Sequence, residues 1–129
     1  MSLAELRAEL EALSERPAEE WVARIATTLQ DHTLLVPILQ YDQATGVLEL
    51  LTGKDASGAA WIYVYTGEDV MIANGLAGAR CGRFKLLEVV RMGRSGNFGG
   101  IVIDQGETGA RGYIPCDRFA EAEHALGGD

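Results

Sequence analysis

The sequence predicts an α+β fold: a single domain in which a mixed sheet of about five strands has helices packed on it and two helices precede it. Two observations support this prediction. Apolar residues recur at helical spacing in residues 1–31, whereas residues 32–129 alternate short β-branched runs with glycine-rich turns. At 129 residues the chain has the length of one domain, so we expect both segments to form one compact unit.

The first expected helix carries a narrow apolar stripe. Ser2 and Glu5 have the spacing of a capping box, which begins the helix. The stripe consists of Leu3, Leu6, Leu10 and Leu13. A stripe this narrow is typical of a seam between helices, and a short helix needs such cover in water. Either the same chain or a second copy could cover it. We predict a homodimer, because a break at 14–18 could let the helix swing away.

Two strands are expected after a second helix. The broader apolar face that follows Pro17 is typical of a core-packing helix. Residues 33–40 (TLLVPILQ) predict a strand, and Pro37 marks it as an edge strand or as the site of a bulge, because proline cannot donate to a ladder. Residues 47–52 predict the next strand, and the small residues of 53–58 predict a hairpin loop.

The most distinctive stretch is AAWIYVYTGEDVMIANG, at 59–75. Its aromatic and β-branched run at 61–65 predicts a buried strand. Thr66 and Asp69 have approximately the spacing of a capping box, so we expect Thr66 to cap a short helix. Asn74 and Gly75 supply a left-handed stop for that helix.

The last third alternates short apolar runs with glycine. Residues 76–83 are expected to be irregular and 93–100 to form a loop, because both are rich in glycine. The spacing within 84–92 favours a helix, although so short a run could also be a strand. Two short strands and a closing helix are predicted at 101–104, 112–116 and 117–126.

The composition excludes several classes of partner. A net charge of −8 repels phosphate backbones and anionic lipid surfaces, so we expect neither nucleic acid nor membrane as a partner. No run has the length of a membrane span, and acidic residues near the start argue against a signal peptide. Cys81 and Cys116 lack a CxxC spacing, so we expect them to be free thiols of a cytoplasmic protein.

No catalytic or metal-binding constellation is visible. A nucleophilic site needs a base beside the nucleophile, and the two histidines, His32 and His124, both fall near expected helix ends or surfaces. Cys81 has basic neighbours that could lower its pKa, but a structural thiol is the commoner role. No metal-ligand spacing occurs. We therefore predict no enzyme activity, no metal and no cofactor.

Residues 80–94 differ in charge from the rest of the chain. Five basic residues occur there against one acidic residue, among glycines that could turn N–H groups toward an anion. Four of them are candidate contacts for an anion or a partner: Arg80, Arg83, Arg91 and Arg94. The alternative is a solvated basic face that offsets acidic neighbours.

Three short motifs resemble the N-terminal domain of the SseB family, named for enhanced serine sensitivity and for a type III secretion component. They are LVP at 35–37, YTG at 65–67 and GIVID at 100–104. The resemblance covers residues 32–126, and the chain departs from it where Asp104 and Gln105 replace the usual Asn and Pro. The family is not known as an enzyme family, so the resemblance implies no catalytic residues.

We therefore predict a non-catalytic bacterial cytoplasmic protein that acts as a protein-interaction or regulatory domain and has a protein partner. The alternative is a small-molecule or anion-binding module, or a weak enzyme, that uses residues 80–94.

Overall fold

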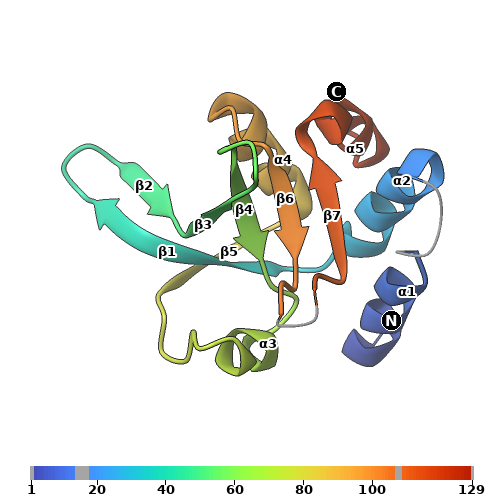
Figure 1. Cartoon of the computed structure of the whole chain (residues 1–129), viewed down its shortest axis with the longest axis horizontal. Coiled ribbons are helices and arrows are strands. Elements are labelled where there is room, and N and C mark those ends of the chain that lie inside the picture. The colour runs from blue at the N-terminus through green and yellow to red at the C-terminus, as the bar shows by residue number, and fades with distance from the viewer. Residues whose placement is uncertain (1, 14–17, 107–108, 129) are drawn as a thin grey trace.

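The structure of the protein is a computed structural model that describes residues 2–13, 18–106 and 109–128 (Figure 1). It has the α+β architecture that the sequence predicts. The helices are α1 (Leu3–Leu13), α2 (Ala18–Leu29), α3 (Glu68–Ala73), α4 (Leu86–Ser95) and α5 (Phe119–Ala125), with the short 3-10 helix η1 (Cys116–Arg118) before α5.

The described strands form two sheets instead of one sheet of about five strands. The three-stranded sheet has the order β2-β1-β5, and the four-stranded sheet has the order β3-β4-β6-β7. The β4–β6 pair is parallel and the other pairs are antiparallel, so the larger sheet is mixed, as predicted. The strands are β1 (Leu34–Asp42), β2 (Val47–Leu50), β3 (Thr52–Lys54), β4 (Ala60–Val64), β5 (Cys81–Phe84), β6 (Gly100–Ile103) and β7 (Gly112–Pro115).

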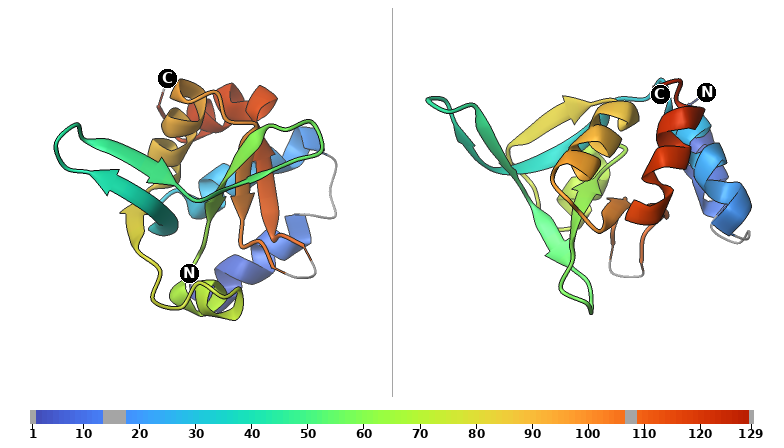
Figure 2. Two further views of the ribbon diagram at one scale, coloured as in Figure 1. Left: turned by 60° about the vertical axis from the view of Figure 1, so that its left-hand side comes forward. Right: turned by 90° about the horizontal axis from the view of Figure 1, so that it is seen from above.

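The two sheets are joined at two places. Only Leu51 separates β2 from β3, so one bent stretch of chain serves both sheets. At the other junction, Leu35 of β1 and Tyr65 after β4 exchange backbone hydrogen bonds of 2.9 and 2.8 Å. The β1–β2 hairpin projects away from the body of the molecule (Figures 1 and 2).

Pro37 does not mark an edge strand, because β1 lies between β2 and β5. The alternative expectation of a bulge is nearly right: the β1–β2 register shifts between Ile38 and Gln40, just after the proline. The Pro37 carbonyl accepts a 3.0 Å hydrogen bond from Leu51, the residue that links β2 and β3. The N–H and C=O of one residue point to the same side of a strand. The N–H that Pro37 lacks would therefore point toward Leu51, between β2 and β3, where the regular pairing of strands is interrupted.

The core lies between the four-stranded sheet and the helices. Helices α4 and α5 cover one face of that sheet, and α1 and α2 pack beside them (Figures 1 and 2). The inward side chains of the sheet are fully buried because side chains alternate between faces along each strand. They are Ile62, Val64, Ile101, Ile103 and Ile114.

Two predicted boundaries are wrong. Residues 81–83, expected to be irregular, and Phe84, expected to begin the next helix, form strand β5, which pairs with the first half of β1. Residues 93–95, expected in a loop, extend helix α4. Gly93 fits this helix because a Cβ there would come within 2.8 Å of the Phe119 ring on α5. The glycine therefore allows close packing of two helices and does not end the first one.

Candidate functional site

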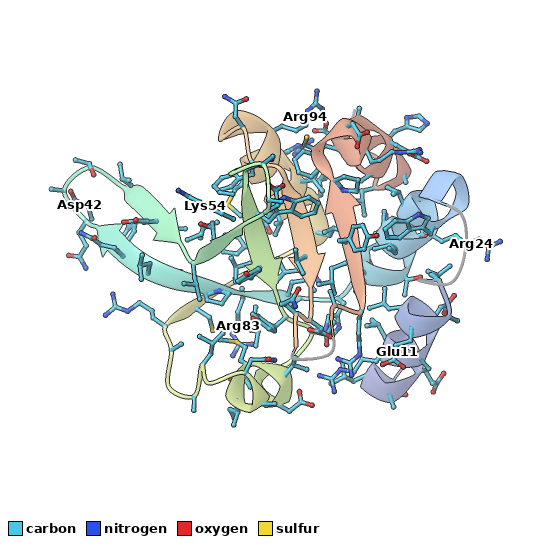
Figure 3. All side chains as sticks on the ribbon, in the orientation of Figure 1. Glu11, Arg24, Asp42, Lys54, Arg83 and Arg94 are labelled. Carbon is cyan, nitrogen blue, oxygen red and sulfur yellow. The ribbon has the colours of Figure 1, made fainter. Side chains whose placement is uncertain are left out.

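The structure places the four arginines that are candidate contacts for an anion or a partner in different surroundings. Arg91 and Arg94 both bind the Glu123 carboxylate on α5, and Arg91 also donates a 2.8 Å hydrogen bond to the Gly128 carbonyl. Arg83 lies 3.7 Å from the Glu68 carboxylate on an exposed surface, and Arg80 is exposed nearby in sequence. Figure 3 shows Arg94 near the top of the view and Arg83 well apart from it in the lower half. Arg91 and Arg94 therefore share one acidic partner on α5, whereas Arg83 has a different one on α3.

The histidines and thiols occupy unrelated positions. The Nε2 atom of His32 lies 2.8 Å from the Thr66 carbonyl oxygen, so this ring contacts backbone and not a nucleophile. His124 is exposed on the surface of α5, and neither cysteine thiol forms a disulfide. Among the described residues, no three His, Cys, Asp or Glu side chains are grouped to hold a metal ion.

The leucine stripe of α1 is covered by its own chain. Leu6, Leu10 and Leu13 are buried in the main core, and Leu3 is 37 % exposed. This is the intramolecular arrangement that the sequence left open beside the dimer. Dimerisation stays a prediction, but covering the stripe no longer requires it.

Thr66 does not cap α3, which corrects the prediction from its spacing to Asp69. Gly67 occupies the N-cap position, and no side chain caps the helix. The Thr66 hydroxyl donates instead to Asp104 Oδ2, and its backbone N–H donates to Asp104 Oδ1, both at 2.7 Å. Asp69 accepts two hydrogen bonds of 2.7 and 2.6 Å from Arg7. These bonds lower the pKa of Asp69 and raise that of Arg7.

The Asp104 carboxylate is the centre of a buried polar network. Its side chain has no solvent exposure, and Arg111 donates a third hydrogen bond to it at 2.8 Å. Arg7 donates to the Thr66 hydroxyl at 2.9 Å, and Arg111 pairs with Glu11 at 3.1 Å. We call these residues the Asp104 network: Arg7, Glu11, Thr66, Asp69, Asp104 and Arg111.

The Asp104 network connects α1 to the ends of β4 and β6. A hollow of about 400 Å³ adjoins it and is lined in part by Glu11, Asp69, Asp104 and Arg111. Each of these four side chains forms an ion pair within the network. The arrangement therefore fixes the position of α1, and its charges already satisfy one another.

The second face of the four-stranded sheet carries aromatic side chains and is covered only in part. Tyr63 packs against a second buried cluster of Leu35, Tyr65 and Met71 of α3, and Tyr113 packs against Trp21 of α2. The side chains of this face alternate along the strands with the buried isoleucines and valine described above. We call this surface the aromatic platform: Trp61, Tyr63, Val102 and Tyr113. Tyr113 is 49 % exposed, and these residues line a groove of about 370 Å³ with Lys54, Asp55 and Gln105 among its other residues.

Glycines let the platform rings lie directly on the backbone. A Cβ at Gly100 would come within 2.3 Å of the Trp61 ring, and one at Gly53 within 1.8 Å of the Tyr63 hydroxyl. Side chains at these positions would therefore displace the rings. Tyr113 stands at 70° to Trp61, with ring centroids 6.3 Å apart, and packs on its other side against Trp21 of α2 at 4.9 Å.

Asp55 holds the Trp61 ring in place. Its carboxylate accepts a 2.7 Å hydrogen bond from the indole N–H of Trp61, and further bonds from the hydroxyl and N–H of Ser57 and the N–H of Ala59. The hydrogen bonds from Ser57 and then Trp61 lower the pKa of Asp55 to about 2. Asp55 is thus ionised at neutral pH, and it fixes both the β3–β4 loop and the indole.

The sequence contained a signal for the platform that a simple reading of hydrophobicity overlooks. The run at 61–65 was expected to be a buried strand, but its period of two places Trp61 and Tyr63 on one face and Ile62 and Val64 on the other. No local signal pairs Thr66 with Asp104, because 38 residues separate them.

Fold and site together define a small mixed α+β domain with a partly covered aromatic face on its larger sheet. The chain belongs to the SseB family, since the model of the SseB protein N-terminal domain matches residues 6–111. No curated protein and no solved structure matches it. The family match confirms the resemblance and begins within α1, so it includes the whole Asp104 network. Within the described residues, no helix is both long and apolar enough to span a membrane.

Proposed function

We propose that this protein is a non-catalytic, cytoplasmic protein-interaction domain that docks a protein partner on its aromatic platform. The observation that carries the proposal is that Trp61, Tyr63 and Tyr113 line one groove on the face of the sheet opposite the main core. Exposed aromatic groups on an apolar surface mark interaction sites, and Trp and Tyr are enriched among the residues that dominate binding energy.

The platform is preorganised for binding. The glycine backbone under the rings and the Asp55–Trp61 hydrogen bond of 2.7 Å restrict the aromatic side chains before a partner arrives. Side chains that are already ordered lose less conformational entropy on association, at about 0.5–1.5 kcal/mol for each one that would otherwise be immobilised. The platform therefore suits docking without rearrangement of the sheet.

The same groove is poorly suited to acid–base chemistry. Asp55 lines it, but a carboxyl with a pKa of about 2 is too weak a base to transfer protons near neutral pH. The other side chains there are mostly apolar or aromatic. This chemistry favours binding over catalysis.

Photocrosslinking from matched tyrosine positions tests the proposal. Tyr113 on the platform and Tyr41 on the hairpin have similar exposures of 49 % and 46 %. We expect Tyr113→p-benzoylphenylalanine to give a discrete adduct with a protein in the bacterial cytoplasm. Tyr41→p-benzoylphenylalanine should give none of that adduct, and Trp61→Leu combined with the Tyr113 probe should abolish it. Equal adducts from both positions, or none from Tyr113, would contradict docking on the platform.

A further inference from the structure

We infer that the partner presents a cationic peptide segment, with an arginine or lysine side chain held against the rings of Trp61 and Tyr113. This inference rests on the proposed function and specifies the chemistry of its partner. Aromatic ring faces carry negative electrostatic potential, and tryptophan binds cations best among the aromatic residues. A guanidinium also stacks on flat rings, which favours arginine.

The ring geometry suits one cationic head group. Trp61 and Tyr113 form a corner, with planes 70° apart and centroids separated by 6.3 Å. A cation in that corner can lie within about 6 Å of both centroids, the range over which the attraction operates. One side of Trp61 lies over Gly99 and Gly100, so a ligand approaches from the solvent side.

The charge of the protein favours the same partner. The whole chain carries −8, which attracts cationic segments and repels anionic ones during encounter. Close to the rings, the ionised Asp55 carboxylate lies 2.7 Å from the Trp61 indole nitrogen. The opposing charge in the groove lining is Lys54, which is exposed at the end of β3 (Figure 3).

Substitution of Lys54 tests the inference, because the affinity for a cationic ligand and for an anionic ligand should change in opposite directions. Lys54→Gln removes one positive charge from the groove and leaves the rings and their glycines intact. A cationic peptide should then bind more tightly by about twofold to fivefold at low salt, since rim charges of this kind are worth up to about 1 kcal/mol. An anionic ligand would bind more weakly to the same variant.

The binding experiment uses the full chain and three synthetic peptides that share a glycine–serine sequence. The first contains arginine, the second has citrulline in place of arginine, and the third has glutamate in its place. Citrulline keeps the planar head group without the charge. We expect the arginine peptide to bind, the citrulline peptide to bind at least fivefold more weakly and the glutamate peptide not to bind, by calorimetry and Trp fluorescence. Trp61→Leu and Tyr113→Leu should each weaken the arginine peptide about threefold to thirtyfold, with Tyr41→Leu unchanged.

The outcomes separate this inference from the proposed function. Equal binding of the arginine and citrulline peptides would overturn the cationic partner, as would no binding of the arginine peptide at millimolar concentration. In each case the adduct at Tyr113 would still support docking on the platform. The inference would also be overturned if Trp61→Leu and Tyr113→Leu both left the affinity for the arginine peptide unchanged. The peptide series and Lys54→Gln keep the platform intact, so they decide the question even where a ring variant unfolds.

Discussion

Replacing Asp104 removes a buried carboxylate that accepts hydrogen bonds from the Thr66 N–H, the Thr66 hydroxyl and Arg111. In Asp104→Ala these donors lose their acceptor while the side chain of residue 104 stays without solvent contact. Breaking a buried pair on one side costs about 3–5 kcal/mol. The backbone of Asp104 is left-handed, at φ 54°, and alanine adds about 1 kcal/mol there. The loss is a large share of the roughly 5–15 kcal/mol that stabilises a domain.

Asp104→Asn distinguishes the hydrogen bonds from the charge. Asparagine tolerates the left-handed backbone and keeps one acceptor oxygen, so we expect a loss of about 1–3 kcal/mol, clearly smaller than for alanine. Urea unfolding at neutral pH measures both changes as shifts of midpoint at constant slope. The control is Asp117→Ala on the exposed surface, expected within about 0.5 kcal/mol of the parent. An alanine variant within about 1 kcal/mol of the parent would refute the role assigned to the network.

The remaining predictions concern the loop, the first helix and the platform glycines. The Trp61 indole N–H resonance should titrate with Asp55 at a pH of about 2, because its hydrogen bond weakens when the carboxylate is protonated; a midpoint near 3.8 would show that the loop is not fixed. Leu10→Ala should cost about 2–5 kcal/mol and Leu39→Ala almost nothing, since these leucines are 0 % and 64 % exposed; similar urea midpoints would mean that α1 is not packed on the core. Gly100→Ala should cost about 1–3 kcal/mol and shift the Trp61 resonances, whereas unchanged spectra would argue against rings seated on glycine.

Local patterns predicted the elements that depend on neighbouring residues. The Glu5 N–H donates to the Ser2 hydroxyl at 3.2 Å, as the capping box required. Gly75 has the positive φ of 77° expected of a left-handed stop after α3. Helix α4 also forms where the apolar spacing favoured it. In each case the deciding interaction lies within about one helical turn of its residue, so the sequence displays it directly.

Long-range partners explain where the predictions from sequence failed. Strand β5 contains Gly82 and lacks a clear alternation, and it forms because β1 offers a partner far away in the chain. Thr66 had the right chemistry for a cap, but Asp104 supplies a buried acceptor that the local spacing could not reveal. The sequence also left open whether the arginines contact an anion or offset acidic neighbours, and the acidic neighbours of Arg83, Arg91 and Arg94 come from distant helices, α3 and α5. Tertiary contacts decided all three outcomes.

The larger sheet has apolar side chains on both faces, but the elements packed on the two faces differ in extent. Strands that are apolar on both faces are typical of sheets with a layer on each side. Here β4 has Ile62 and Val64 on its buried face and Trp61 and Tyr63 on the other, and the cluster that contains Met71 of α3 covers the second face only in part. The second face therefore has the side chains of a covered surface but lacks a complete layer. Docking of a partner on the platform would complete that layer, which connects the proposed function to the strand pattern of the sequence.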